Sequence, residues 1–158
     1  FTGLDAKIKW PNDVIVGNKK ICGILTEMTA QTDMVDFVVI GIGINVLQES
    51  FPEEIAYKAT SLKIETKSEP DLSELMHEII ATLDKTILSY LFGISQDDLK
   101  LYKSMCATIG REVSLVRNGE KLTGKAIDIT ADGELVVCLE NGKKIAVNSG
   151  EVTVQGIY

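Results

Sequence analysis

The chain has 158 residues, of which 45% are hydrophobic and 25% are charged, so it can bury a core and is not of disordered composition. Its net charge of −7 argues against a nucleic-acid-binding module, which would gather lysine and arginine on one face. The longest strongly apolar run, residues 37–47, is far shorter than the roughly 20 residues needed to cross a bilayer, so we expect no membrane contact either.

The cysteine and histidine content gives little support for a metal site or a thiol nucleophile. Cys22, Cys106 and Cys138 form no CxxC pair, and His77 is the only histidine, expected at the surface of a helix. Each cysteine lies in an apolar stretch and is expected to pack as a small hydrophobe. No metal-binding residues are therefore predicted, and a reducing, cytoplasmic location fits best.

The start of the chain shows neither a signal peptide nor an initiator methionine. Strand-like residues follow at once, which indicates a start inside a larger protein. The Asp13–Val16 segment and residues 20–28 are β-rich and are separated by Gly17-Asn18, which predicts a hairpin. Residues 36–40 are almost continuously apolar, which is typical of a strand buried on both faces.

Helical periodicity begins after this extended region. Apolar residues recur at spacings of three and four over residues 72–91, with Asp71 as a plausible N-cap and Gly93 ending the pattern. A second, shorter helix is predicted at 95–107.

After Gly110 the pattern changes to short strands separated by Asn-Gly and Asp-Gly pairs, which favour the backbone angles of tight hairpins. The predicted strands are Glu112–Arg117, Glu120–Ile129, 134–139, 143–147 and Val152–Val154. Five such strands predict a small antiparallel barrel of SH3-like type. We place the domain boundary between residues 108 and 109.

The most unusual local sequence is Lys-Trp-Pro-Asn-Asp at residues 9–13. Pro11 cannot donate to a strand ladder and biases Trp10 toward an extended backbone, so a strand should end sharply there with Lys9 on a fixed element. Such a lysine could offer a point charge to a carboxylate or a phosphate. Taken alone, the motif favours a surface lysine beside a packing corner. The pair Lys19-Lys20, at an expected turn, is interpreted as solvated charge.

Two glycine-containing segments follow. The sequence Gly-Ile-Gly-Ile-Asn at residues 41–45 lacks the third glycine and the following helix of a Rossmann fingerprint. It could mark the close approach of a ligand, with Asn45 recognising an adenine, or equally a bulge followed by a turn. Gly23 would leave room for a flat ligand beside Ile24, or could be a strand glycine in a tight core.

In their order, the motifs at residues 9–13, 20–27 and 41–45 resemble those of the biotin protein ligase family. The resemblance continues through Ala-Thr-Ser-Leu at residues 59–62 and the long helix to the closing strand of the barrel at 149–152. It implies an α+β fold, with part of a class-II-synthetase-like mixed sheet and its helices followed by the SH3-like barrel.

The resemblance also implies an activity. Family members join biotin to ATP as biotinyl-5′-AMP and then transfer the biotin to a lysine of a carboxylase's biotin carboxyl carrier domain. ATP and biotin would be the substrates, with Mg²⁺ bridging the phosphates. By the same resemblance, Lys9 is the catalytic lysine and contacts the biotin carboxylate and the α-phosphate. Gly23, Ile24 and Gly43 would line the biotin pocket, and Asn45 would read the adenine.

One part of the family pattern is missing. The Gly-Arg-Gly-Arg-x-Gly-Arg loop that lies upstream of the first motif is not in this sequence. We therefore expect the isolated chain to be a fragment that does not make biotinyl-AMP at a useful rate. Exposed sheet edges should make it self-associate, as a homodimer, or depend on the missing part. A non-catalytic module that docks a carrier or partner protein, and a lipoate ligase-like adenylating enzyme, are the alternatives; the first and third motifs favour biotin over lipoate.

Overall fold

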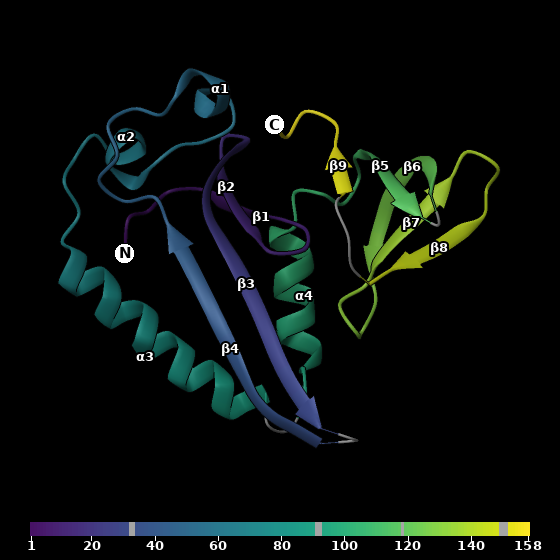
Figure 1. Cartoon of the computed structure of the whole chain (residues 1–158), viewed down its shortest axis with the longest axis horizontal. Coiled ribbons are helices and arrows are strands. Elements are labelled where there is room, and N and C mark those ends of the chain that lie inside the picture. The colour runs from purple at the N-terminus through teal and green to yellow at the C-terminus, as the bar shows by residue number, and fades with distance from the viewer. Residues whose placement is uncertain (32–33, 91–92, 118, 149–151) are drawn as a thin grey trace.

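The computed structural model describes residues 1–31, 34–90, 93–117, 119–148 and 152–158, with the backbone alone at residues 30, 31, 34, 35 and 90 (Figure 1). Among these residues the strands form two antiparallel sheets. The first runs in the order β1 (Ala6–Lys9), β2 (Asp13–Val16), β3 (Lys19–Gln31) and β4 (Met34–Ile44). The second runs in the order β8 (Lys144–Val147), β7 (Leu135–Leu139), β6 (Glu120–Ile129), β5 (Glu112–Arg117) and β9 (Val152–Val154). The α+β class with a small SH3-like second sheet is confirmed.

The β2–β3 hairpin forms where the sequence predicts it. Gly17 and Asn18 have φ angles of 54° and 76°, as the tight turn requires, and β3 follows at Lys19. The register pairs Asp13 with Gly23 and shifts by a bulge between Val14 and Ile15.

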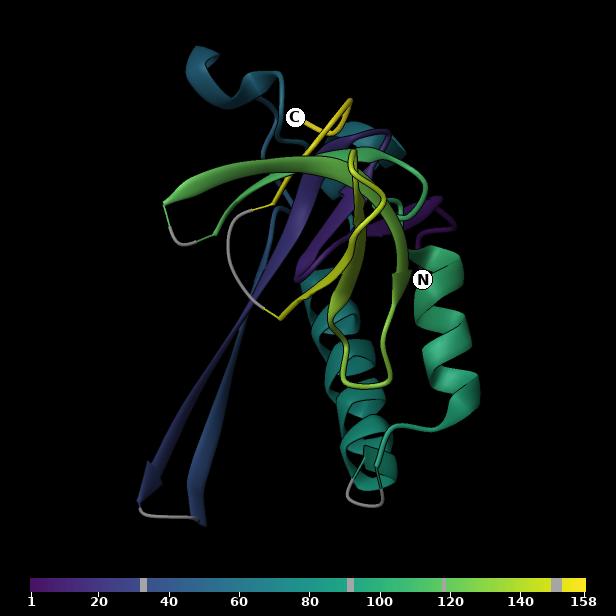
Figure 2. The same cartoon turned by 90° about the vertical axis from the view of Figure 1, so that its right-hand side faces the viewer.

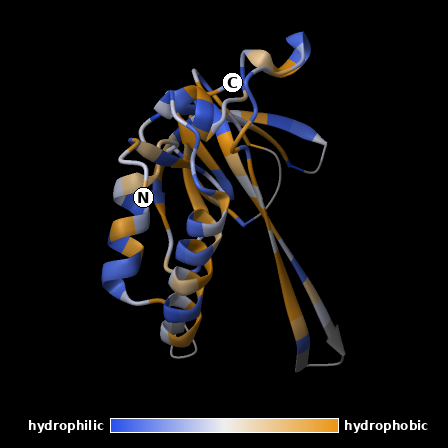
Figure 3. Cartoon of the chain, turned by 90° about the vertical axis from the view of Figure 1, so that its left-hand side faces the viewer, coloured by the Kyte–Doolittle hydropathy of each residue, from blue (hydrophilic) through white to orange (hydrophobic). Residues whose placement is uncertain are grey.

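The predicted burial of residues 36–40 is wrong. They belong to β4, yet Phe37 is 58% exposed and Ile40 is 43% exposed. β2 pairs with β3 only as far as Gly23, so among the described strands β4 alone pairs with the rest of β3. The two strands continue together as a ribbon that projects from the molecule (Figure 2). Apolar sequence therefore does not produce burial here, and Figure 3 shows hydrophobic residues along the projecting ribbon.

The described part of the chain also contains four helices: α1 (Glu53–Ala56), α2 (Leu62–Thr66), α3 (Leu72–Tyr90) and α4 (Gln96–Met105). The Asp71 carboxylate accepts hydrogen bonds from the backbone N–H groups of Ser73 and Glu74, at 2.8 and 3.0 Å, which confirms the N-cap of α3. His77 is exposed on that helix, as predicted. An apolar groove of about 310 Å³ separates α3 from β4, with Ile42, Ile44 and Ile79 among its lining residues.

The strands of the second sheet match the prediction to within one residue. β6 and β7 approach each other closely at Gly124, because a Cβ there would lie only 3.0 Å from the Leu139 Cα atom of the neighbouring strand. The predicted turn residue Asn118 and the family-like sequence Ser149-Gly150-Glu151 lie outside the described residues.

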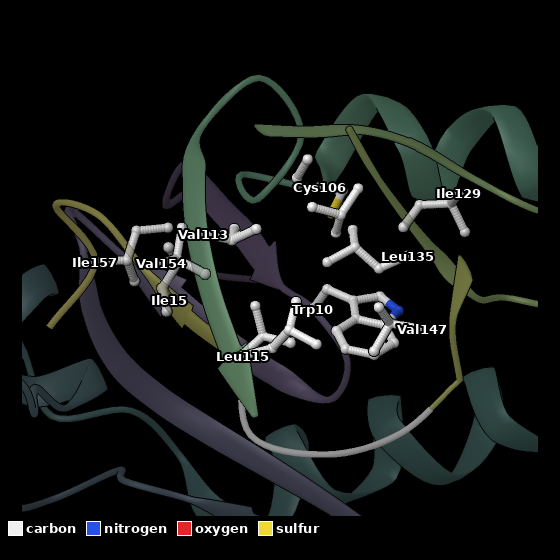
Figure 4. Close-up of a cluster of buried hydrophobic side chains, with 13 residues drawn as sticks. Trp10, Ile15, Cys106, Val113, Leu115, Ile129, Leu135, Val147, Val154 and Ile157 are labelled. Carbon is white, nitrogen blue, oxygen red and sulfur yellow. The ribbon is translucent and has the colours of Figure 1, made fainter. Parts of the chain in front are cut away.

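The main hydrophobic core joins the two sheets. Trp10, from the β1–β2 turn, and Ile15, from β2, are both 2% exposed and pack among the second-sheet residues Val113, Leu115 and Leu135 (Figure 4). The Trp10 indole N–H also donates a hydrogen bond to the Gly133 carbonyl oxygen, 2.9 Å away. The boundary at residues 108–109 falls between α4 and β5 and stays a prediction.

Two further expectations can be compared with the structure. All three thiols are free, and Cys22 and Cys106 are buried in the hydrophobic clusters, which confirms that these two pack as small hydrophobes. Cys138 is half-buried and belongs to neither cluster, so its packing stays a prediction. Within the described part of the chain, no helix is both long and apolar enough to cross a membrane.

Candidate active site

The turn that carries Pro11 is tied to the neighbouring strand. The Asn12 side-chain amide donates to the Ile24 carbonyl oxygen at 2.6 Å, and the Ile24 N–H donates to the Asn12 carbonyl oxygen at 2.9 Å. The Trp10–Pro11 peptide bond is cis. With Trp10 buried and Asn12 bonded, the ends of β1 and β2 are fixed, so Lys9 and Asp13 face each other as cross-strand partners. Lys9 thus lies on a fixed strand end, as predicted.

Four side chains meet at this strand end, and we call them the lysine cluster: Lys9, Asp13, Lys20 and Tyr158. The Lys20 ammonium lies 2.6 Å from Asp13 Oδ1, and the Tyr158 hydroxyl donates to Asp13 Oδ2. The Lys9 ammonium lies over the Tyr158 ring, 4.4 Å from its centroid. Two cations and one carboxylate give the cluster a net positive charge, which suits an anionic ligand.

Lys20 was interpreted from the sequence as a solvated charge, and that interpretation is wrong. Its ammonium is held by Asp13, and a Cβ on Gly23 would lie only 2.8 Å from Lys20 Nζ. Its backbone is fixed as well, since its N–H donates to the Lys58 carbonyl and its carbonyl accepts from the Thr60 N–H. The signal that could have found it is the Lys-x-x-Gly spacing, because a glycine at position 23 leaves space for the Lys20 side chain over the strand.

Gly23 and Gly43 share a face with the lysine cluster. Asp13 pairs with both Lys9 and Gly23, and Gly23 pairs with Gly43, and cross-strand partners project to the same side of a sheet. A Cβ at Gly43 would meet the Gly23 carbonyl oxygen at 3.8 Å, an ordinary contact. The structure therefore brings Lys9, Gly23 and Gly43 together on a surface with few side chains.

Ile24 lies on the opposite face. Its side chain packs against the cluster of Ile21, Cys22 and Leu62, on the side that α3 covers. Burial is the main cause that raises the pKa of the Cys22 thiol above its ordinary value, so this side is apolar. A cavity of about 430 Å³ opens there, lined by apolar residues that include Cys22, Ile42 and Leu75. Sequence reasoning did not separate the two faces.

Asn45 follows β4 and is held rigidly. Its side-chain amide donates to the Thr60 carbonyl oxygen at 3.0 Å, its N–H donates to Ile21, and its carbonyl accepts from Leu62. The Thr60 and Ser61 side chains are buried at 1% and 0% exposure. The plane of the Asn45 amide is thus fixed, which recognition of a flat base would need.

Two parts of the chain match sequence models of known protein families. Residues 1–45 match the sequence model described as "Biotin/lipoate A/B protein ligase family", and residues 108–154 match "Biotin protein ligase C terminal domain". The chain belongs to the biotin protein ligase family.

Two curated relatives share most of this chain. It is 37% identical over 145 residues to the bifunctional ligase/repressor BirA of Bacillus spizizenii, which covers 90% of this chain and 44% of that protein. It is 33% identical over 147 residues to the biotin–[acetyl-CoA-carboxylase] ligase of Mycobacterium tuberculosis, covering 92% of this chain and 52% of that protein. The chain therefore spans about half the length of these relatives.

Solved structures agree with this assignment. The apo biotin protein ligase of Aquifex aeolicus superposes with a TM-score of 0.85 at 29% identity, over 98% of this chain and 66% of that chain. The same ligase in complex with biotin and ATP gives a TM-score of 0.81 at 28% identity, over 98% of this chain and 63% of that chain. The structural similarity to this ligase therefore covers both sheets of the chain.

Proposed function

We propose that this chain supplies part of the active site of a biotin protein ligase. Such an enzyme activates biotin with ATP to biotinyl-5′-AMP and transfers the biotin to a lysine of a carboxylase carrier domain. The observation that carries the proposal is the lysine cluster, in which Lys9 and Lys20 converge beside the glycine-lined face. The Aquifex aeolicus relative in complex with biotin and ATP supports it.

The first step brings two anions together. A carboxylate oxygen of biotin attacks the α-phosphorus of ATP, and the bond to the departing pyrophosphate breaks. Ammonium groups at the meeting point offset the repulsion between carboxylate and phosphate and stabilise the charge that develops. Lys9 and Lys20 can both supply such charge, while Asp13 holds Lys20 in place.

The second step requires no covalent enzyme intermediate. The neutral amine of the carrier lysine attacks the acyl carbon of biotinyl-AMP, AMP leaves with the electron pair of the broken C–O bond, and the nitrogen releases a proton to water as the amide forms. The residues of this chain would act by holding the adenylate. Gly23 and Gly43 leave the sheet open to a flat ring, and Asn45 would read the adenine. Ile24 would contribute from the opposite face, by packing the strand behind the pocket.

The expected Mg²⁺ would bridge the phosphates of ATP, and the described side chains of this chain are not proposed as its ligands. Among the described residues there is no group of three histidine, cysteine, aspartate or glutamate side chains that could hold a metal. Both oxygens of Asp13 are engaged, by Lys20 and Tyr158. No step of the proposed reaction is therefore assigned to a metal held by these side chains.

The partners remain part of the proposal. The acceptor would be a biotin carboxyl carrier domain, in the cytoplasm, and the projecting β3–β4 ribbon favours self-association as a homodimer or association with other parts of the ligase. Its exposed apolar residues are the kind of surface that proteins cover in an assembly.

Calorimetric titration of the 158-residue chain with a non-hydrolysable biotinyl-adenylate analogue tests the site. We expect Lys9→Gln and Lys20→Gln each to weaken binding by about tenfold or more, as loss of a charge-assisted contact would. Lys7→Gln is the matched control, because Lys7 lies on the same strand but pairs with Asp5. Binding unaffected by a substitution would remove that lysine from the site.

A pyrophosphate-exchange assay of the same chain tests the fragment expectation. We expect no useful rate of biotinyl-AMP synthesis without the arginine-rich loop. A rate near that of an intact ligase would contradict this expectation.

A further inference from the structure

The end of the chain returns from the barrel to the lysine cluster. After β9, the Gln155 N–H donates to the Glu112 carbonyl oxygen at 2.9 Å, and Ile157 is fully buried in the main core. The Arg111 guanidinium donates to the Gln155 carbonyl oxygen at 3.2 Å and to Asn18 Oδ1 at 3.4 Å. Residues 155–157 are thus held against the second sheet, and Arg111 links them to the β2–β3 turn, which fixes the backbone that precedes Tyr158.

Tyr158 touches the cluster in two ways. Its hydroxyl donates to Asp13 Oδ2, and its ring lies beneath the Lys9 ammonium. Burial is the main cause that raises the pKa of Tyr158 above its ordinary value, and the hydrogen bond to Asp13 adds to it. The phenol therefore stays protonated at neutral pH and can only be a donor to Asp13.

These contacts decide how Asp13 is shared. A carboxylate has two oxygens and could bind two lysines, and Lys9 is its direct cross-strand partner, with Cβ atoms about 5 Å apart. The Tyr158 hydroxyl donates to Oδ2 and the Lys20 ammonium pairs with Oδ1, so both oxygens of Asp13 are held by side chains other than Lys9.

We propose that Tyr158 is a positioning residue of the lysine cluster. Its hydroxyl holds Asp13 by Oδ2 while Asp13 Oδ1 holds the Lys20 ammonium, and its ring holds the Lys9 ammonium 4.4 Å from the ring centroid. The consequence for ligand binding rests on the proposed ligase function, but the arrangement of the unliganded side chains does not.

The arrangement is tested first without any ligand. In NMR spectra of the chain with carbon-13-labelled lysine, the ε-methylene protons of Lys9 should resonate upfield of those of Lys7, because an aromatic face shields protons above it. Tyr158→Phe should keep this shift and Tyr158→Leu should abolish it. Tyr57→Leu is the matched control, since Tyr57 is exposed and lies under Lys58, 5.6 Å from ring centroid to ammonium. An unshifted Lys9 in the unsubstituted chain, or a shift that survives Tyr158→Leu, would overturn the proposal.

The ligand consequence is tested with the biotinyl-adenylate analogue. We expect Tyr158→Leu to weaken its binding by about tenfold and Tyr158→Phe by about threefold, with no effect of Tyr57→Leu. If Tyr158→Leu does not fold, the test rests on Tyr158→Phe. Unchanged affinity of that variant for the analogue would contradict a positioning role of the hydroxyl. Failure of the unsubstituted chain to bind the analogue would count against the proposed function, while the Lys9 resonance would still decide the positioning role.

Discussion

The second sheet and the β3–β4 ribbon are built from similar sequences with opposite outcomes. In the second sheet, Val113, Leu115 and Val137 are 3%, 5% and 0% exposed. In the ribbon, Val38 and Val39 are 49% and 50% exposed, although both regions are antiparallel and rich in β-branched residues. The difference lies in what covers the strands. The second sheet curves over a core that Trp10 helps to fill, whereas the ribbon extends beyond β2.

The largest expected effect contrasts the core with the ribbon. Trp10→Ala should lower the free energy of unfolding by about 4 kcal/mol, because it removes a buried indole and leaves a cavity. Phe37→Ala, at a 58% exposed position, should change it by less than about 0.5 kcal/mol. Urea unfolding of both variants measures this. Similar losses would show that the ribbon is buried in solution and would break the comparison.

The next effect contrasts two strand glycines. Gly124→Ala should destabilise by about 2 kcal/mol, because its Cβ would meet the backbone of β7, which cannot move away cheaply. Gly43→Ala should cost less than about 0.5 kcal/mol, since its nearest neighbour is 3.8 Å away, yet it should weaken binding of the adenylate analogue. Thermal unfolding measures the loss of stability in each variant, and calorimetric titration measures the loss of binding. A destabilised Gly43→Ala would mean that this glycine serves packing.

The ribbon itself can be altered without touching the core. Phe37→Ser together with Val39→Ser should reduce self-association of the chain while changing its stability by less than about 0.5 kcal/mol for each residue. Sedimentation equilibrium over a range of concentrations measures the effect, with Val116→Ser, a 70% exposed barrel residue, as control. A monomeric unsubstituted chain at high concentration would contradict the expectation of self-association.

The last expected effect concerns alkaline pH. Burial is the main cause that raises the pKa of Tyr102 from 10.0 to about 12, and its hydroxyl donates to the Pro11 carbonyl oxygen at 3.1 Å. The unfolded chain loses this proton near pH 10 while the folded chain keeps it, so the contribution to stability is full below pH 10 and is lost between pH 10 and about 12.

Tyr102→Phe should flatten this part of the pH profile of the melting temperature. At pH 7 it should cost about 1 kcal/mol, for the lost hydrogen bond. An equally steep alkaline decline in the Phe variant would assign the loss to other groups.

What could be predicted from the sequence was local. The strands of the second sheet follow from turn pairs such as Asp132-Gly133 and Asn141-Gly142, and Gly133 and Gly142 have the positive φ angles that these turns need. The N-cap of α3 follows from Asp71 in the same way. These features depend on neighbouring residues, and the physics that sets them acts over a few positions.

What could not be predicted depended on distant parts of the chain. Lys20 reaches Asp13 across a strand bulge that no local pattern announces, and Tyr158 reaches Asp13 over a separation of 145 residues. The exposure of residues 36–40 depends on the length of β2, not on their own composition. Lys9, Asp13 and Lys20 all stand in recognisable motifs, but only Lys9 was given a role from the sequence, and Tyr158 stands in none.

The burial of Trp10 in the barrel core makes the candidate site and the barrel one mechanical unit. Trp10 directly follows Lys9 and makes two hydrogen bonds that hold this strand end. Its indole N–H donates to the Gly133 carbonyl oxygen, and its backbone N–H donates to the buried Thr108 hydroxyl. A substitution that destabilises the second sheet far from any ligand should therefore also weaken ligand binding at the site. A different C-terminal domain could replace the second sheet only if it kept a pocket that fits the Trp10 indole.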